Sequence, residues 1–384
     1  MKINNQQKNV LINALTLNIG GGIQVGKGFV EYCANKKFKN LKLHFLLSRE
    51  LYNSINKKLL KKIKYWKLDS KPSYFSKKGI KNLKIIKKIC ENFNYSLVYS
   101  IGFPSYINFK IPELGRYTNP WEYMPNAQAW KVLSFGEKIK RFLLNKYRIY
   151  WAKKANYFET QTFYAAKCLK KKLKINLNKI YVINNSANPI FRAKEAKMQN
   201  NLKKNIFCLA ADYIHKNILI IPEIAYFLNK LDKKNQYNFY ITLPKESKTW
   251  IKIQKKMKSL KILNIINVGP LNLNECKKYY IKSDCVLQPS LLEVFSATYL
   301  EAMQMMRPLL VPNLKFAKDI CKNGAIYYKY NSPLNAAKKI FILFNNNNLY
   351  KKQIKNGYKN LRFYPTLEIN MKKLIAIIKY LCAK

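Results

Sequence analysis

The chain has 384 residues, of which 48% are hydrophobic and 14% aromatic, enough for two domains with a sizeable core. Its formal net charge of +53 comes from lysines spread along the whole chain, and no basic arm, zinc-finger or RNP-type motif points to nucleic acid as a partner. Two interpretations of the charge stay open: a compositional bias at exposed positions, or affinity for anionic partners such as nucleotide phosphates and an acidic membrane surface.

Short apolar runs alternate with amphipathic stretches along the chain, a pattern typical of βα units and parallel sheets. The first half predicts strands over 9–15, 41–47, 96–101, 115–118, 155–160 and 179–183, and helices over 26–33, 80–91 and 135–151. The second half predicts strands over 205–211, 237–243, 261–268, 285–288, 309–311 and 325–327, and helices over 217–228, 247–258, 274–282, 294–306 and 367–381.

The polar segment 188–205 loses this periodicity and predicts a domain boundary. We therefore expect an α/β fold of two doubly wound, Rossmann-like domains that face each other across a cleft. Sheets of this kind bind ligands at the carboxyl ends of their strands.

Two carboxylates, Glu293 and Glu301, stand eight residues apart where a predicted strand meets the predicted helix 294–306. Because eight residues is slightly over two turns, we expect both along one helix face. The start of a helix offers free N–H groups that suit a phosphate, and two acids beside it could bond sugar and ribose hydroxyls. Most charged pairs at this spacing form a solvated face, but the chain has only 19 acidic residues and this pair lies among apolar ones.

The surrounding fifteen residues, P-S-L-L-E-V-F-S-A-T-Y-L-E-A-M from Pro289 to Met303, resemble the donor-site motif of family-four glycosyltransferases of the GT-B fold. That motif reads roughly P-S-x-x-E-x-F-G-x-x-x-x-E-A-M. His215-Lys216-Asn217, after the predicted strand 205–211, resembles the H/R-K-N motif of the same family. The resemblance is strongest over 205–332 and keeps its order before that.

The resemblance implies a retaining glycosyltransferase with an acceptor-side domain over 1–190 and a donor domain over 200–364. Its last helix, within 365–384, would pack back onto the first domain. The donor, a nucleotide-sugar, is the substrate, and no separate cofactor is implied. The departing phosphate itself would take the acceptor proton, so no protein base is required.

The resemblance also assigns roles to residues of this sequence. Glu293 would contact hydroxyls of the donor sugar, Lys216 would stabilise the diphosphate, and Glu301 would bind the ribose. Backbone N–H groups of Phe295, Ser296, Ala297, Gly21 and Gly22 would assist, and Gly269-Pro270 would lie beside the base.

Departures from the family pattern accompany these matches. Ser296 and Ala297 stand where the family more often has glycine, and no arginine precedes Lys216 in the stretch Ala210-Ala211-Asp212. Another cation, such as Arg307 or a lysine of the first domain, would have to replace it.

Gly20-Gly21-Gly22 follows the first predicted strand, and Gly21-x4-Gly26-Lys27 nearly spells a P-loop. Gly28, however, occupies the position where magnesium binding needs a Ser or Thr hydroxyl. We expect a glycine-rich loop whose backbone comes close to a ligand, with a plain connector as the alternative. It resembles the loop that faces the donor phosphate in family-four enzymes.

Asn119, Trp121 and Glu122 follow the predicted strand 115–118 and could contact the acceptor or the sugar. Trp121 could stack on a sugar ring, and Asn119 and Glu122 could form hydrogen bonds with its hydroxyls. The alternative is an ordinary aromatic core at a strand end. The five aspartates are isolated, so no Asp-x-Asp pair offers the metal site of a GT-A transferase, and we predict no metal.

The eight cysteines form no C-x-x-C pair, and most lie in apolar contexts, so we predict buried thiols in a reducing compartment. No stretch approaches 18 uninterrupted apolar residues, and Asn13 and Asn18 interrupt any signal-peptide core. We expect a cytoplasmic protein with peripheral attachment to the inner membrane face.

The predicted function is therefore transfer of a sugar to a saccharide or lipid-linked acceptor in surface-glycan synthesis. The alternatives are a non-catalytic nucleotide-sugar or glycan-binding relative, and a basic membrane- or nucleic-acid-binding protein.

Overall fold

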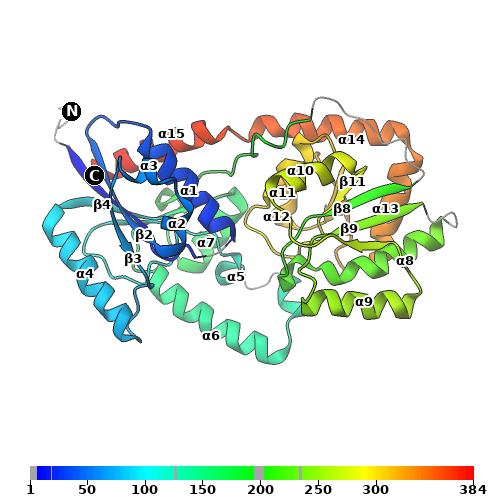
Figure 1. Cartoon of the computed structure of the whole chain (residues 1–384), viewed down its shortest axis with the longest axis horizontal. Coiled ribbons are helices and arrows are strands. Elements are labelled where there is room, and N and C mark those ends of the chain that lie inside the picture. Colours follow the sequence, from blue (N-terminus) through cyan, green and yellow to red (C-terminus); the bar gives the residue numbers. More distant parts are fainter. Residues whose placement is uncertain (1–6, 19, 125–127, 194–202, 233–235) are drawn as a thin grey trace. The chain divides into compact units, whose positions relative to one another are not determined.

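The computed structural model describes residues 7–18, 20–124, 128–193, 203–232 and 236–384 (Figure 1). The chain divides into two compact units. The first is made of Met1–Tyr123, Ile139–Ile183 and Glu368–Lys384, and the second of Met124–Lys138 and Asn184–Leu367. Each unit is built on one parallel sheet with helices, so the predicted fold class of two doubly wound, Rossmann-like domains is confirmed.

The first sheet has seven parallel strands in the order β3-β2-β1-β4-β5-β6-β7. Strand β1 is buried on both faces: Val10, Leu11, Ile12 and Ala14 are all inaccessible to solvent, as expected where helices cover both sides of a parallel sheet. The strands are β1 (Lys8–Ala14), β2 (Leu41–Ser48), β3 (Lys64–Leu68), β4 (Tyr95–Ser100), β5 (Glu113–Arg116), β6 (Tyr157–Thr160) and β7 (Ile180–Val182).

Helices cover the two faces of this sheet through separate apolar clusters. One cluster joins Val10 and Ile12 to Phe29 of α1 and Ile378 of α15, and the other joins Leu11 to α4. The helices are α1 (Gly20–Ala34), α2 (Arg49–Ser54), α3 (Lys57–Leu60), α4 (Lys77–Phe93), α5 (Pro120–Tyr123), α6 (Phe135–Ala152), α7 (Phe163–Leu173) and α15 (Leu367–Cys382).

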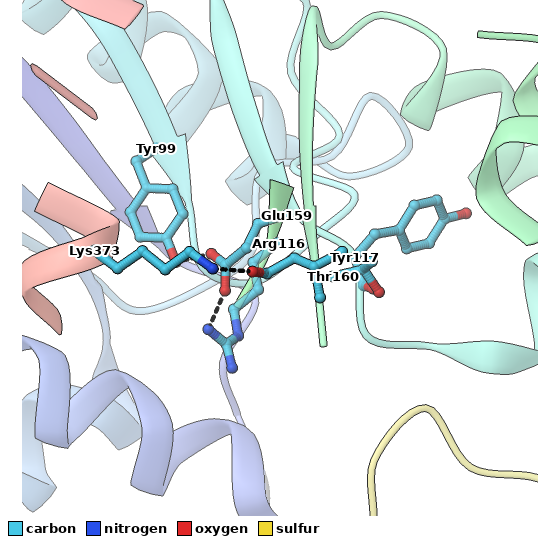
Figure 2. Close-up of polar contacts among 7 residues, drawn as sticks. Tyr99, Arg116, Tyr117, Glu159, Thr160 and Lys373 are labelled. Atoms are coloured by element: carbon cyan, nitrogen blue, oxygen red, sulfur yellow. Dashed lines mark hydrogen bonds and ion pairs between the residues drawn. The ribbon is translucent and has the colours of Figure 1, made fainter. Parts of the chain in front are cut away.

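The last helix, α15, belongs to the first unit although it follows the whole second sheet in sequence. Lys373 of α15 donates from Nζ to the carbonyl of Val182 in β7 at 2.9 Å (Figure 2). The same view shows the buried ion pair between Arg116 and Glu159. The hydroxyl of Tyr99 donates to Glu159 Oε2 at 2.5 Å, so the carboxylate is held from two sides.

The second sheet has six parallel strands in the order β10-β9-β8-β11-β12-β13. They are β8 (Lys204–Cys208), β9 (Tyr237–Ile241), β10 (Ile265–Asn267), β11 (Cys285–Leu287), β12 (Leu309–Pro312) and β13 (Ile326–Tyr328). The helices are α8 (Ile221–Leu231), α9 (Lys248–Leu260), α10 (Leu273–Lys282), α11 (Ala297–Gln304), α12 (Lys315–Cys321), α13 (Pro333–Asn345) and α14 (Asn347–Asn360).

Some elements differ from the sequence prediction. The edge strand β3 was not predicted because Lys64 and Lys67 interrupt its short apolar sequence. Helices α7, α13 and α14 were also missed. The last of these has 14 residues rich in Asn and Lys, which masks the apolar stripe that identifies a helix.

None of the eight cysteines forms a disulfide, and six of them are buried. Across the described ranges, no helix is both long enough and apolar enough to cross a membrane.

Candidate functional site

The strands β8 and β11 of the second sheet are hydrogen-bonded neighbours, and the order in which the chain adds strands reverses between them. From β8 the chain moves through β9 to β10 on one side, and from β11 through β12 to β13 on the other. Ligands of open α/β sheets bind at such switch points, outside the carboxyl ends of the strands. The loops that follow β8 and β11 are therefore the place where a functional site is expected, and they carry both sequence motifs.

These two loops are joined directly. The N–H of Leu291 donates to the carbonyl of His215 at 2.8 Å. His215 lies in a short 3-10 turn, η3 (Ile214–Lys216), which ends at Asn217 in the left-handed region with φ 55°. Asparagine tolerates that conformation better than most residues. The turn fixes the direction in which the Lys216 side chain leaves the loop.

Lys216 and Glu293 form an ion pair across the two loops, with Nζ 2.5 Å from Oε1. Their side chains are only 17% and 11% exposed. Removing one partner of so sheltered a pair leaves the other charge poorly compensated. The structure thus brings together the two residues that the sequence assigns to catalysis.

Helix α11 begins at Ala297 rather than at residue 294 as predicted. Glu293 lies in the preceding loop, so the expectation that Glu293 and Glu301 share one helix face is wrong. Ser296 is the N-cap residue, with φ −94° and ψ 118°, and the ring of Phe295 packs edge-on against Tyr364 with centroids 5.6 Å apart. The ion pair and this ring contact tie the loop to other parts of the chain, and the first turn of α11, with its free N–H groups, starts at Ala297.

Glu301 lies in the second turn of α11 and is largely buried. The hydroxyl of Tyr280, on α10, donates to Glu301 Oε2 at 2.8 Å. Burial raises the pKa of the Glu301 carboxyl, and the bond from Tyr280 partly opposes that shift by favouring the carboxylate. Tyr280 was not predicted, because nothing in a sequence shows which residue of another helix will face a buried acid.

The loop after β11 also contains polar side chains that no described residue satisfies. Gln288 and Ser290 are buried, and neither the Gln288 amide nor the Ser290 hydroxyl has a hydrogen-bond partner within the described part of the chain. Buried polar atoms without partners are uncommon and costly. This loop therefore has hydrogen-bonding capacity available to a ligand.

Gly269 and Pro270 follow β10, at the same carboxyl edge of the sheet but two strands away from β8. Gly269 has φ +78°, and its N–H donates to Asn267 Oδ1 at 3.3 Å. A tight turn that needs glycine is thus present. A contact with a nucleoside base stays a prediction.

The glycine run of the first unit is not a loop, because Gly20, Gly21 and Gly22 form the first turn of α1. Close packing explains part of the glycine content: a Cβ at Gly26 would lie 2.6 Å from Leu17 Cδ1, and one at Gly22 would lie 3.3 Å from Leu17 Cδ2. The start of a helix still offers N–H groups, so the phosphate contact of Gly21 and Gly22 stays a prediction.

Asn119 immediately precedes α5, and Trp121 and Glu122 lie within it and are buried. Asn119 donates to Glu122 Oε1 at 2.6 Å, and Arg148 pairs with the same oxygen at 2.9 Å. Trp121 and Glu122 therefore help to attach α6 to the first unit. This placement favours the structural alternative for both, and their contact with sugar is untested.

Arg307 cannot replace the missing arginine of the family motif. It immediately precedes β12, at the amino edge of the second sheet, and its Nη2 donates to the carbonyl of Ile281 at 3.1 Å. Lys216 follows β8 at the opposite, carboxyl edge. The expectation that Arg307 takes over this role is therefore wrong.

His44, the other histidine of the chain, is not part of this site. His44 is buried in β2, and burial together with Lys64 and Lys42 lowers its pKa to about 4. Among the described residues, no three His, Cys, Asp or Glu side chains are grouped so as to hold a metal ion. Whether the protein needs a metal stays a prediction.

The chain is similar to known glycosyltransferases. Residues 194–360 match the family model described as glycosyl transferases group 1. The O-antigen chain mannosyltransferase RfbU of Salmonella typhimurium is 26% identical over 197 residues, which are 50% of this chain and 52% of that protein. The alignment thus spans about half the length of this curated relative.

Solved structures share the fold over nearly the whole chain. A glycosyltransferase from Rickettsia africae has a TM-score of 0.70 and 16% identity, with 98% of each chain covered. Anabaena Alr3699/HepE, in complex with UDP and glucose, has a TM-score of 0.69 and 9% identity, and 97% of this chain and 100% of that one are covered.

Proposed function

We propose that this chain is a family-four glycosyltransferase of the GT-B fold, which transfers a sugar from a nucleotide-sugar to a saccharide or lipid-linked acceptor and retains the configuration at the anomeric carbon. We place this reaction in surface-glycan synthesis. The curated relative is named for O-antigen chains, and the Anabaena structure holds UDP and glucose, which makes donors of this class the natural ones to test.

One observation carries the proposal: Lys216 and Glu293 meet at the switch point of the second sheet, beside the start of α11. The Lys216 ammonium would turn from Glu293 to the diphosphate and stabilise the negative charge that develops as it leaves. Glu293 would then accept hydrogen bonds from hydroxyls of the donor sugar.

The other predicted donor contacts extend this arrangement. N–H groups at the start of α11 would bind phosphate oxygens, because the helix dipole favours an anion there. The Glu301 carboxylate, oriented by Tyr280, would accept hydrogen bonds from the ribose hydroxyls. Charge on the leaving group would thus be neutralised by protein groups, and we propose a metal-independent transfer of a hexose.

The test is turnover of a panel of nucleotide-sugars by the full-length protein, measured as release of the nucleoside diphosphate. UDP-glucose, UDP-galactose, UDP-N-acetylglucosamine and GDP-mannose are compared with and without a lipid-linked saccharide acceptor and with EDTA. We expect acceptor-dependent release with one donor, no loss on chelation, and a product whose NMR coupling constants show the anomeric configuration of the donor.

The variant Lys216→Met is expected to lower kcat by about 10²–10³-fold, the usual loss when one group that stabilises transition-state charge is removed. Its matched control is Lys256→Met, which breaks the more exposed pair of Lys256 with Glu223 in the same unit. Equal activity of Lys216→Met and wild type would exclude the proposed role of Lys216.

A second candidate is a non-catalytic nucleotide-sugar or glycan-binding relative. The stretch Ala210-Ala211-Asp212 lacks the family's arginine. Arg307 cannot replace it, because it donates to the carbonyl of Ile281 at the amino edge of the sheet. Saturable binding of a nucleotide-sugar without turnover, in the presence of every acceptor tried, would favour this second candidate.

A further inference from the structure

Helix α6 is attached to the first unit through its polar side. The guanidinium carbon of Arg141 lies 3.9 Å from the centroid of the Trp121 ring. Asn145 Nδ2 donates to the Trp121 carbonyl at 2.7 Å, and Arg148 pairs with Glu122 at 2.9 Å. Positions 141, 145 and 148 recur at helical spacing, so one continuous face of the helix makes all these contacts.

The opposite face of α6 is apolar and exposed. Phe135, Ile139, Phe142, Leu143 and Tyr150 are 79%, 47%, 52%, 60% and 56% exposed. Their spacing of four, three, one and seven residues places them on one stripe of the helix. Figure 1 shows α6 as one unbroken helix, so this spacing holds along its whole length. A helix of a water-soluble domain normally turns such a stripe inward, and here the polarity is reversed.

Lysines accompany the stripe. Lys146 lies on the same face, with Nζ 4.6 Å from the centroid of Phe142, and Lys154 Nζ lies 5.0 Å from the centroid of Tyr150. Lys138 and Lys153 are exposed nearby. Long lysine side chains can run along an apolar surface and keep their charge at its polar rim.

The loop before α4 extends this surface with aromatic rings. Phe75 is 83% exposed, and its ring centroid lies 6.0 Å from that of Tyr147 on α6. Tyr74 stacks on Trp151, with centroids 5.3 Å apart and planes 13° from parallel. Tyrosine and tryptophan rings are enriched where one side of a ring meets lipid and the other meets water.

We propose that α6 lies in the plane of an anionic lipid bilayer surface, with its apolar stripe inserted among the acyl chains and its lysines at the phosphate groups. An exposed apolar stripe with lysines beside it is the pattern of an interfacial helix. A second copy of the chain fits less well, because a two-fold contact would bring the same lysines face to face. The inference rests on α6 and its neighbours, and it holds whether or not the proposed transfer reaction is correct.

The test is co-sedimentation of the full-length protein with vesicles of phosphatidylcholine alone or mixed with phosphatidylglycerol, at low and high salt. Wild type should bind the anionic vesicles and keep part of that binding at high salt. The double variant Phe142→Ser, Leu143→Ser should lose roughly 100-fold in partition, since each fully buried large apolar side chain contributes about tenfold. The control is Ile251→Ser, Leu263→Ser, which changes two exposed apolar residues of the second unit.

A second readout keeps the proposal testable if the double variant folds poorly. The fluorescence that Phe142→Trp adds to that of wild type should be quenched by brominated acyl chains, whereas the fluorescence that Leu263→Trp adds should not. Binding that salt abolishes fully and that Phe142→Ser, Leu143→Ser leaves unchanged would overturn the proposal in favour of diffuse lysine attraction. Concentration-dependent dimerisation that the same double variant abolishes, without vesicle binding, would overturn it in favour of self-association.

Discussion

Lys216 Nζ lies 2.5 Å from Glu293 Oε1, although 77 residues separate the two in sequence. The contact joins the loop after β8 to the loop after β11. These are the two neighbouring strands between which the order of strand addition reverses. The family resemblance assigned these two residues to the donor from separate motifs. The fold explains why both motifs are needed at one place, since neighbouring parallel strands end at the same edge.

The free energy of unfolding should reveal this pair by its coupling. In a double-mutant cycle, Lys216→Met and Glu293→Gln are expected to couple by about 1–3 kcal/mol, because each single change leaves a sheltered charge without its partner. Urea denaturation of the four proteins measures the coupling. The cycle Lys256→Met and Glu223→Gln is the control; its side chains are 41% and 40% exposed, and it should couple by less than about 1 kcal/mol. Equal coupling in both cycles would contradict the sheltered position of Lys216.

The affinity for the nucleotide should depend on pH through Glu301. Burial raises the pKa of this carboxyl, and the Tyr280 hydroxyl opposes the rise. Only the carboxylate accepts from both ribose hydroxyls, so affinity should fall as pH drops through that pKa. Tyr280→Phe removes the opposing bond and should move the fall to higher pH, as measured by calorimetric titration across a pH series. Tyr279→Phe is the neighbouring control, and a midpoint that moves to lower pH in Tyr280→Phe would exclude this arrangement.

The free energy of unfolding should decrease as pH rises because of Glu113, at the start of β5. Burial raises the pKa of this carboxyl to about 7, although Ser100 Oγ donates to its Oε1 at 2.5 Å. The folded state therefore holds the proton more tightly than the unfolded state. The stabilisation that this protonated carboxyl contributes is complete below its pKa in the unfolded state. It is lost, at about 1.4 kcal/mol per pH unit, as the pH rises to its pKa in the folded state.

Glu113→Gln keeps an oxygen for Ser100 and removes the ionisation, so it should gain stability relative to wild type between acid and neutral pH, by about 3 kcal/mol in total. Denaturation of both proteins at pH 5 and pH 8 measures the gain, with exposed Glu91→Gln on α4 as the control. The same difference between Glu113→Gln and wild type at both pH values would show that the Glu113 carboxyl is not perturbed.

Two glycines of α1 should respond oppositely to alanine. A Cβ at Gly26 would lie 2.6 Å from Leu17 Cδ1 and 3.2 Å from Leu51 Cδ2, whereas one at Gly28 meets no atom within 4 Å. Gly26→Ala should cost about 1–3 kcal/mol through overpacking, and Gly28→Ala should gain up to about 1 kcal/mol from helix propensity. Tm values of the two variants measure this, and a stabilised Gly26→Ala would contradict the close packing of α1.

The sequence predicted the two-sheet architecture because parallel strands such as β11 and β12 are continuous apolar runs that stand out from lysine-rich surroundings. It could not predict the start of α11. Residues Val294 to Ser296 have a helix-compatible pattern, but in the structure they precede the helix, and Glu293 and Phe295 beside them contact distant residues. Local propensity was outweighed by tertiary contacts, which a sequence pattern does not contain.

The same limit explains Tyr280 and the buried pair of Arg116 and Glu159. A lone glutamate inside the apolar strand β6 does signal a buried partner, because an unpaired charge there would be costly. Nothing in the sequence, however, identifies that partner as Arg116 of the neighbouring strand. The reversed polarity of α6 was hidden too, since periodicity shows that a helix has an apolar stripe and not which way the stripe faces.

Calorimetric titration of nucleoside diphosphates tests the central claim most directly. UDP, GDP, ADP and CDP are titrated into wild type, Lys216→Met and Lys256→Met. We predict saturable binding of one diphosphate by wild type and Lys256→Met, and a loss of about tenfold or more in Lys216→Met, since a charge-assisted bond contributes about 1.5–3 kcal/mol. Unchanged affinity in Lys216→Met, or no saturable binding of any diphosphate by wild type, would contradict the assignment of the donor site to the switch point between β8 and β11.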